Sequence, residues 1–339
     1  MESIIKINQH SKTPKYKQII NSVITGVEKE KFTVDDQLPS VNSLLIRFDI
    51  SRDTVVKAYD HLKSVGLINS VPGKGYYIKT SNYRLKAKVF LLFNKMSAHK
   101  QVIYDSFVKA LGSKASVDLY IYNNDFQQFR NIICTHKNQD YTHFVIIPHF
   151  QDPTACASGL LNQLPKHKLI LLDKNLKGIH GAYASVHQNF EEDIYQVLVK
   201  AVDRLGKYNC LKMIFPTNSY HPKEILSGFK RFCKQYSFDH KIVNDISSES
   251  IREKEVYINL TDNDLVTLVK RIKHIGFKVG SEVGIISYNH TTLKEVLLDG
   301  VTVISTDFKE LGASAARLIL NNEKKQISNP FRLIVRNSL

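Results

Sequence analysis

Tryptophan is absent from this sequence, and cysteine is scarce. The 339 residues include four cysteines, none of them in a C-x-x-C pair: Cys134, Cys156, Cys210 and Cys233. Zinc ribbons and dithiol redox sites need such pairs, so the spacing argues against both. We expect these thiols to be reduced and structural, as in a cytoplasmic protein.

Long apolar stretches are missing as well. Runs such as Val89–Phe93 and Leu169–Leu172 fall far short of the roughly 20 residues that cross a bilayer. The first residues carry scattered lysines in a polar context, with no apolar segment behind a basic one. This pattern argues against a secretory signal. We therefore expect a cytoplasmic protein without membrane attachment.

Motifs of catalysis and metal binding are not found either. The sequence contains no G-x-S-x-G, H-E-x-x-H or P-loop motif, and its 13 histidines show no metal-ligand spacing. We predict no catalytic residue, no metal site and no cofactor.

The composition supports folded domains and shows an excess of positive charge. Hydrophobic residues make up 43% of the chain and charged residues 23%, which is near the average of globular proteins. The length is typical of two or three domains. The formal net charge is +15, of which residues 1–80 carry +4 and residues 81–339 carry +11. Such an excess suggests nucleic acid as a partner, but its even spread leaves the contact region to be located from motifs.

Three helices are expected near the N-terminus. Apolar residues recur at helical spacing in residues 13–28, with Thr13 as the cap and Pro14 in the first turn. Ser40 and Ser51 are N-cap candidates for a short second helix and a longer third one. The turn of two or three residues between those helices is typical of a helix-turn-helix.

Two short strands should follow the third helix. Gly73 and Gly75 lie between Leu67–Ile68 and Tyr76–Ile78, and this arrangement predicts a hairpin, or β-wing. Three helices and a wing make a winged helix-turn-helix domain, which we place at residues 1–80. The polar residues 81–87 are the candidate linker.

From residue 88 to residue 339 the pattern changes to apolar strands that alternate with helices. Strands of nearly continuous apolar character indicate a parallel sheet covered on both faces, and their number favours two doubly wound lobes, as in periplasmic binding proteins. The expected strands are Val89–Phe93, Leu119–Tyr122, Phe144–Ile147, Leu169–Leu172, Lys212–Phe215, Val256–Asn259, Val283–Ile286 and Val301–Ser305. The expected helices include 99–112, 190–206, 222–236, 262–275 and 309–322. The fold class is thus α/β and multidomain.

The first 80 residues closely resemble the GntR family of bacterial transcription regulators. The matching stretches, in order, are Pro14–Ile19, Leu38–Ser40, Ile50–Val55 and Gly73–Ile78. Residues 87–339 more weakly resemble the sugar-sensing lobes of LacI-type regulators and the type I periplasmic binding proteins, most clearly in Gly276–Val283 and Ser287–His290. Together the resemblances imply a regulator of the arabinose-repressor-like subgroup, with a GntR-type head and an effector-binding body.

Several positions depart from these families, among them Val41 and Ile225. Asn42 stands where most GntR members carry an arginine that touches DNA, and Lys57 stands where they usually carry another arginine. In the body, Asn289 replaces the sugar-binding aspartate common in LacI-type proteins, and Glu224 occupies a region where an arginine is expected. Lysine is a poorer bidentate reader of guanine than arginine, so these departures bear on the preferred operator and effector.

A recognition helix needs short polar groups that meet phosphates and a long cation that reaches base edges. The third helix offers both, and Lys74 at the wing tip could enter the minor groove. The predicted DNA-binding residues are Ser40, Asn42, Ser51, Arg52, Thr54, Lys57, Gly73, Lys74 and Gly75. The spacing alone also allows plain helix capping, a solvent ion pair between Arg52 and Asp49 or Asp53, and an ordinary hairpin turn.

Doubly wound lobes bind ligands at the carboxyl ends of their strands. Carboxylates and amides there suit the vicinal hydroxyls of a sugar, with an aromatic ring such as Phe150, Tyr220 or Tyr288 over its apolar face. The predicted effector-binding residues are Asn94, Lys95, Asp173, Gln188, Asn189, Glu224, Asp262, Asn289 and His290. Each one alone could equally be an ordinary helix cap.

These observations predict a homodimeric, ligand-responsive transcription regulator. Its partners would be double-stranded operator DNA and a small effector, a monosaccharide or sugar derivative, and it would control carbohydrate-utilisation genes. The alternative is a sugar- or nucleotide-active α/β enzyme with a DNA-binding head. A nicotinamide site would need a glycine-rich turn after the first strand, whereas the residues that follow it, Asn94–Ser97, contain no glycine. A DNA-binding structural protein with a vestigial sensor is a third possibility.

Overall fold

The computed structural model describes residues 4–9, 11–80, 87–113, 115–150, 156–217, 219 and 221–339. The candidate linker therefore lies, apart from Ala87, outside the described residues. The chain forms two compact units. Unit 1 comprises Met1–Val186 and Leu311–Gln326, and unit 2 comprises His187–Glu310 and Ile327–Leu339.

The N-terminal part of unit 1, which we call the head, has three helices and a two-stranded sheet. The elements are α1 (Lys15–Glu28), α2 (Val41–Phe48), α3 (Arg52–Ser64), β1 (Ile68–Val71) and β2 (Gly75–Ile78). The two strands pair in antiparallel register, with Ile68 opposite Ile78. Apolar residues spaced three and four apart on α1 and α3 fill one core together with Phe32 and Leu44. The expected winged helix-turn-helix is therefore observed.

One predicted cap in the head is wrong. α1 begins at Lys15, Pro14 occupies its N-cap position, and no side chain caps it. The hydroxyl of Thr13 instead accepts a hydrogen bond from the backbone N–H of Leu119, at 2.6 Å. A contact more than a hundred residues away in the sequence has replaced the local one.

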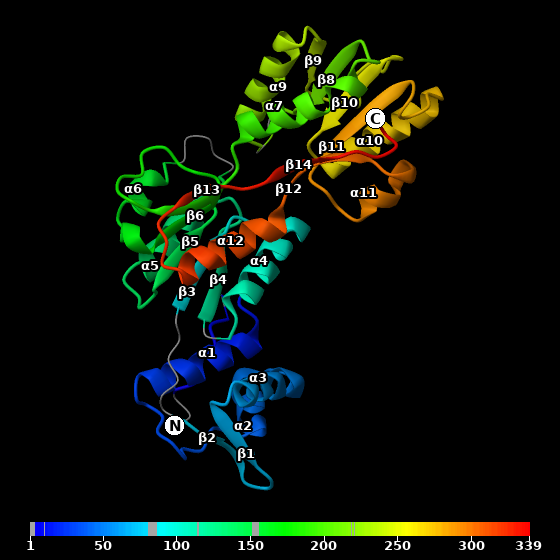
Figure 1. Ribbon diagram of the computed structural model, residues 1–339. Helices are drawn as coiled ribbons and strands as arrows, with labels where there is room; N and C mark the ends of the chain where they lie inside the picture. The colour runs from blue at the N-terminus through cyan, green and yellow to red at the C-terminus, as the bar shows by residue number, and fades with distance from the viewer. Residues whose placement is uncertain are drawn as a thin grey trace. The chain divides into compact units, whose positions relative to one another are not determined.

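The rest of unit 1, which we call lobe 1, is a six-stranded sheet between helices (Figure 1). Its strand order is β13-β7-β6-β5-β3-β4, and β4, β3, β5 and β6 run parallel. The strands are β3 (Ala87–Phe93), β4 (Ala115–Ile121), β5 (His143–Ile146), β6 (Leu169–Asp173), β7 (Ala184–His187) and β13 (Gln326–Ser328). The helices are α4 (Ala98–Leu111), α5 (Phe126–His136), α6 (Ser158–Leu161), the 3-10 turn η1 (Lys166–Lys168) and α12 (Phe308–Leu320).

In lobe 1, α12 packs against α4, and the two helices lie side by side in Figure 1. A Cβ atom placed on Gly312 would lie 2.2 Å from Ser106 Oγ and 2.3 Å from the carbonyl oxygen of Ile103. Only glycine allows the two helix backbones to approach this closely.

Unit 2, which we call lobe 2, repeats the same architecture. Its strand order is β14-β12-β11-β10-β8-β9, parallel except for β14. The strands are β8 (Cys210–Ile214), β9 (Asp239–Val243), β10 (Glu255–Asn259), β11 (Val283–Tyr288), β12 (Thr302–Thr306) and β14 (Phe331–Ile334). The helices are α7 (Phe190–Lys200), α8 (Val202–Leu205), α9 (Glu224–Gln235), α10 (Asp262–Ile275), α11 (Leu293–Val296) and the 3-10 turn η2 (Leu297–Asp299).

The expected strands and helices of the body all appear, with ends that shift by a few residues and with 190–206 divided into α7 and α8. The doubly wound, two-lobed fold is thus confirmed. Among the described residues, no helix is both long and apolar enough to cross a membrane.

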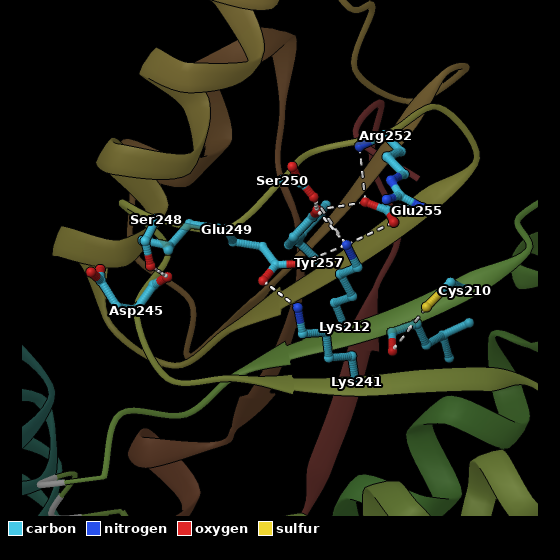
Figure 2. Close-up of polar contacts among 12 residues, drawn as sticks. Cys210, Lys212, Lys241, Asp245, Ser248, Glu249, Ser250, Arg252, Glu255 and Tyr257 are labelled. Carbon is cyan, nitrogen blue, oxygen red and sulfur yellow. Dashed lines mark hydrogen bonds and ion pairs between the residues drawn. The ribbon is translucent and has the colours of Figure 1, made fainter.

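Lobe 2 contains a buried charge cluster where a crossover has no helix (Figure 2). Residues 244–254 connect β9 to β10 across β8 and form only turns. Beneath them, Lys212 of β8 is only 5% exposed. Its ammonium lies 2.8 Å from Glu249 and 2.7 Å from Glu255, and it donates to the carbonyl oxygen of Ser250 at 3.1 Å.

Both carboxylates of this cluster have further partners. Glu255 accepts a hydrogen bond from the Tyr257 hydroxyl at 2.6 Å, and Glu249 lies 2.8 Å from the ammonium of Lys241. Burial alone would raise the pKa of the Glu249 carboxyl, but the two lysines lower it below its usual value. The charge of Lys212 is thus balanced, and the loop is held against the sheet.

We predict that Lys212→Ala lowers the free energy of unfolding by about 3–5 kcal/mol, because it leaves two buried carboxylates without their shared cation. The control is Lys241→Ala, which removes the other cation on Glu249. The Lys241 side chain is 57% exposed, so its loss should cost less than about 1 kcal/mol. Urea denaturation of the full chain measures both, and equal costs would contradict this account of the cluster.

Candidate DNA-reading and effector-binding sites

The turn between α2 and α3 is fixed by local hydrogen bonds. Ser40 Oγ accepts from the backbone N–H of Ser43 at 3.1 Å and caps α2. Asp49 ends that helix in the left-handed conformation, with φ of 49°. Ser51 Oγ then caps α3 by accepting from the backbone N–H of Thr54 at 3.3 Å. Both predicted caps are therefore present.

The first turn of α3 presents polar groups to solvent. Ser51 and Arg52 are exposed and Thr54 is half-buried, with 2.9 Å between the hydroxyl oxygens of Ser51 and Thr54. Arg52 forms no ion pair with any described residue, Asp49 and Asp53 included. The guanidinium is thus available to a ligand such as a phosphate or a guanine edge.

The wing is held by its own backbone. Gly73 and Gly75 adopt φ of 72° and 111°, which favours glycine. The carbonyl oxygen of Lys74 accepts hydrogen bonds from Gln37 Nε2 at 2.6 Å and from the Tyr77 hydroxyl at 3.2 Å. The Lys74 side chain is exposed, so a fixed backbone carries a free cation at the wing tip.

Two other predicted DNA-binding residues, Asn42 and Lys57, have different surroundings. Asn42 is exposed on the first turn of α2. The ammonium of Lys57 lies over the ring of Tyr16 on α1, 4.4 Å from its centre. This cation–π contact holds Lys57 toward α1. Gln37, which fixes the wing, was not predicted from the sequence, because its role depends on a contact with Lys74, far along the chain.

In lobe 1, the predicted residues gather at the carboxyl edge of the parallel strands. Asn94 follows β3 and is buried. Its Nδ2 donates to Asn124 Oδ1 at 2.7 Å, whereas its Oδ1 is buried without a hydrogen bond to any described residue. Lys95, the next residue, is half-buried. The edge therefore offers an acceptor that a ligand hydroxyl could satisfy.

Asp173 ends β6 at the same edge, but its carboxylate already has partners. The ammonium of Lys100 lies 2.6 Å from Asp173 Oδ2, and Nε2 of His149 lies 3.0 Å from the same oxygen. Burial alone would raise the pKa of Asp173, but Lys100 and His149 hold it well below its usual range. Burial lowers the pKa of His149, and Asp173 offsets only part of that effect.

Lys100 and His149 were not predicted from the sequence. Lys100 lies on α4, in the same periodic set as Ile103, Tyr104 and Phe107. A lysine on the apolar face of a helix is a signal of a buried partner, so this residue could have been found. His149 lies outside any helix, so no such periodic pattern points to it.

In lobe 2, a buried lysine joins three predicted residues. Lys294 of α11 lies 2.8 Å from Asp262 Oδ1 and donates to the carbonyl oxygens of Tyr288, at 2.9 Å, and Asn289, at 2.8 Å. Burial lowers the pKa of Lys294, and Asp262 partly offsets the effect. His290 follows directly, and its Nε2 lies 3.1 Å from Glu295. Lys294 itself was missed.

Two polar atoms of this cluster are left without partners. Asn289 Oδ1 and His290 Nδ1 are buried and form no hydrogen bond with any described residue. Asn289 adopts the left-handed conformation, with φ of 61°, which asparagine tolerates better than most residues. The carboxyl ends of β10 and β11 thus carry a second set of groups suited to ligand hydroxyls.

The remaining predicted residues of lobe 2 have other surroundings. Gln188 Oε1 accepts a hydrogen bond from the Thr306 hydroxyl. Asn189 occupies the N-cap position of α7 without a side-chain cap bond, and Glu224 is exposed at the start of α9. Glu224 therefore has the ordinary position of an acidic residue in a first turn.

Two of the three candidate aromatic rings, Phe150 and Tyr288, lie within the lobes. Phe150 packs against Tyr122, Phe126 and Phe129 in lobe 1. Tyr288 is buried beside Phe331 in lobe 2, with ring centres 5.4 Å apart. Tyr220 lies outside the described residues.

Comparison with known proteins locates two families along the chain. Residues 15–78 match the model of bacterial regulatory proteins of the gntR family, and residues 206–339 match the periplasmic binding protein-like domain. The HTH-type transcriptional repressor YtrA of Bacillus subtilis is 33% identical over 107 residues, which are 32% of this chain and 78% of YtrA. This chain belongs to the gntR family of bacterial regulatory proteins.

Other matches of this gntR-family chain are partial or concern the fold. The HTH-type transcriptional regulator YydK of Bacillus subtilis is 30% identical over 81 residues, which are 24% of this chain and about a third (34%) of YydK. The trehalose repressor from Escherichia coli superposes with a TM-score of 0.61 at 16% identity and covers 74% of this chain and 100% of that structure. The likeness to the trehalose repressor shows a shared fold.

We predict that Asp173→Asn lowers stability at pH 7 by about 3 kcal/mol, because it leaves the buried ammonium of Lys100 without its counter-ion. Asparagine accepts the positive φ of this position, 75°, so the backbone is not strained. The pKa of Asp173 is lowered in the folded protein, so its contribution is present above about pH 4 and is lost as the pH falls further.

The stability gap between the natural protein and Asp173→Asn should therefore narrow between pH 7 and pH 3 in urea denaturation. Asp140→Asn is the control, since the Asp140 side chain is 80% exposed and lies 4.0 Å from Lys29. A gap of the same size at both pH values would show that the Asp173 charge is not what stabilises lobe 1.

Proposed function

We propose that this chain is a ligand-responsive transcription regulator that binds operator DNA through α3 and the wing. The observation that carries the proposal is the first turn of α3, where Ser51 and Arg52 are exposed next to the half-buried Thr54 and Arg52 forms no ion pair with any described residue. Serine and threonine hydroxyls position a helix on phosphates, and arginine reads guanine O6 and N7. The DNA contacts are thus Ser40, Asn42, Ser51, Arg52, Thr54, Lys57, Gly73, Lys74 and Gly75.

The proposed effector is a monosaccharide or a sugar derivative. Support comes from the two lobe edges. Each has a charge pair with a buried lysine, and each leaves buried amide or imidazole atoms without a hydrogen bond to any described residue. Such groups form directional hydrogen bonds to hydroxyls. The trehalose repressor, which shares the fold, is named for a sugar. The effector residues of the proposal are Asn94, Lys95, Asp173, Gln188, Asn189, Glu224, Asp262, Asn289 and His290, and the controlled genes would serve carbohydrate use.

We also propose that the active form is a homodimer in the bacterial cytoplasm. A two-fold dimer presents two recognition helices to half-sites about one helical turn apart, which is how such domains read palindromes. On lobe 2, the α11 side chains Leu293 and Val296 are 65% and 72% exposed. Exposed apolar side chains of this kind are favourable at a subunit interface.

We predict that Arg52→Ala weakens binding to a specific duplex by about 10- to 100-fold, the effect of losing one bidentate base contact. The duplex is selected with the natural protein from a randomised pool and measured by fluorescence anisotropy at one fixed salt concentration. Lys63→Ala is the control, because Lys63 is exposed at the far end of α3 and donates to Ser70 Oγ at 3.0 Å. Unchanged affinity in Arg52→Ala would remove this residue from the interface.

A thermal-shift panel of monosaccharides tests the effector class, since saturation at about 100 times Kd stabilises a protein by roughly 2.7 kcal/mol. We expect at least one sugar to raise the melting temperature and Asp262→Asn to weaken its binding by about tenfold, through loss of a charged acceptor.

Asp264→Asn is the matched control for Asp262→Asn. It lies on the same first turn of α10, but its carboxylate accepts from the Thr261 hydroxyl at 2.7 Å. No shift with any sugar would contradict the proposed effector class, and equal effects of the two variants would exclude Asp262 from the site.

A further inference from the structure

The edge of the lobe-1 sheet is a surface that the proposed function does not use. β4 is the last strand of that sheet and pairs on one side only, with β3. The other side of such an edge strand presents backbone N–H and C=O groups that need partners. On β4 these groups belong to Val117 and Leu119.

Residues just before α1 occupy this edge. The backbone N–H of Lys12 donates to the carbonyl oxygen of Leu119 at 3.0 Å, and the hydroxyl of Ser11 donates to the same oxygen at 3.3 Å. The hydroxyl of Thr13 accepts from the N–H of Leu119 at 2.6 Å and donates to the carbonyl oxygen of Val117 at 3.5 Å. The exposed side of β4 is thus satisfied by the head.

The segment that forms these contacts is fixed to α1. Thr13 is only 2% exposed. Gln18 Nε2 donates to the carbonyl oxygen of Thr13 at 2.8 Å, and Gln18 Oε1 accepts from the backbone N–H of Asn8 at 2.7 Å. A shift of β4 would therefore be transmitted to the helical core of the head through a short, hydrogen-bonded segment.

Two side chains further along α1 extend the contact. The ammonium of Lys17 donates to the Tyr104 hydroxyl of α4 at 3.1 Å. Asn21 Nδ2 donates to Asp118 Oδ1 of β4 at 3.2 Å, and the other oxygen of Asp118 accepts from the Tyr141 hydroxyl at 3.0 Å. The head thus meets lobe 1 along one face of α1.

Two cavities border the contact. One, of about 340 Å³, is lined by residues that include Lys6, Gln18 and Asp118, and the other, of about 250 Å³, has Tyr16 and Val117 in its wall. Hydrogen bonds cross the contact beside these cavities.

The contact also leaves the DNA-reading groups uncovered. Arg52, Lys74 and Ser40 are exposed, and none of them lines either cavity. Docking of the head on β4 is therefore compatible with DNA binding, and it fixes the direction in which α3 points from lobe 1.

The far end of β4 leads to the candidate effector edge. Tyr122 follows the strand directly. Its hydroxyl accepts a hydrogen bond from the backbone N–H of His149 at 2.9 Å, and the His149 side chain pairs with Asp173. Two residues further along, the side-chain oxygen of Asn124 accepts a hydrogen bond from the side-chain amide of Asn94. One strand thus has the head on its outer edge and effector groups at its carboxyl end.

We propose that the outer edge of β4 is the docking surface for residues 11–13 and α1, and that the docked head is the operator-binding form. Docking orients the head before it binds DNA, so the loss of docking weakens operator binding. Since β4 also ends at the effector edge, it couples the two sites. The role in DNA binding rests on the function proposed above, whereas the docking itself does not.

Hydrogen exchange followed by mass spectrometry on the full chain tests the docking without DNA or effector. Thr13→Val keeps the shape of the side chain and removes the hydroxyl, so the amide of Leu119 loses its acceptor. Peptides that cover 115–121 should exchange at least tenfold faster at one amide in Thr13→Val, and at the natural rate in Thr13→Ser, which keeps the hydroxyl.

Unchanged exchange at 115–121 in Thr13→Val would overturn the docking. Peptides from α3 report whether the head is folded, and Tyr104→Phe provides a second route if Thr13→Val unfolds it. This variant removes only the hydroxyl that meets Lys17, and it should also speed exchange at 115–121. If Thr13→Val does not fold, an exchange rate at 115–121 in Tyr104→Phe equal to that of the natural protein would overturn the docking.

A separate measurement tests the consequence for DNA. Thr13→Val should bind the selected duplex about fivefold more weakly than Thr13→Ser, the effect of a lost hydrogen bond. Faster exchange with equal DNA affinity would keep the docking but overturn its role in operator binding. No selected duplex at all would instead refute the proposed function.

Discussion

The need to pair every buried charge organises both lobes of this protein. Parallel strands bring their carboxyl ends to one edge, and the side chains that follow them there are polar. A charged group buried at such an edge is costly unless an opposite charge pairs with it. Lys100 meets Asp173 in lobe 1, and the buried Lys294 meets Asp262 in lobe 2. These pairs hold α4 and α11 in place, so the polar atoms around them have fixed positions.

The head follows a different rule, because its proposed DNA-reading surface is built from hydrogen bonds within the head. Ser40 and Ser51 cap their helices within three residues, and the wing backbone is held by Gln37 and Tyr77. Such bonds form within the domain and do not depend on the lobes. The head can therefore keep one DNA-binding surface while its attachment to lobe 1 changes.

The same distinction explains what the sequence could and could not predict. Residue spacing predicted the helix-turn-helix, the wing and the apolar strands, since these depend on neighbours along the chain. It missed β9, whose first three residues are exposed at a sheet edge, and the short strands β7, β13 and β14. It placed Thr13 as a helix cap because the competing partners, Val117 and Leu119, are distant in sequence. Lys294 and His149 were missed for the same reason, as only the fold brings their partners together.

We propose that ligand and operator bind to one molecule in which the two sites are coupled. The most direct test measures the Kd of a stabilising sugar by calorimetry, with and without the selected duplex, and the Kd of the duplex with and without the sugar. Thermodynamic linkage requires the two affinities to change by the same factor, about 5-fold or more for a regulator. Our account predicts such equal, non-zero changes. Affinities that do not respond to the other partner would contradict it.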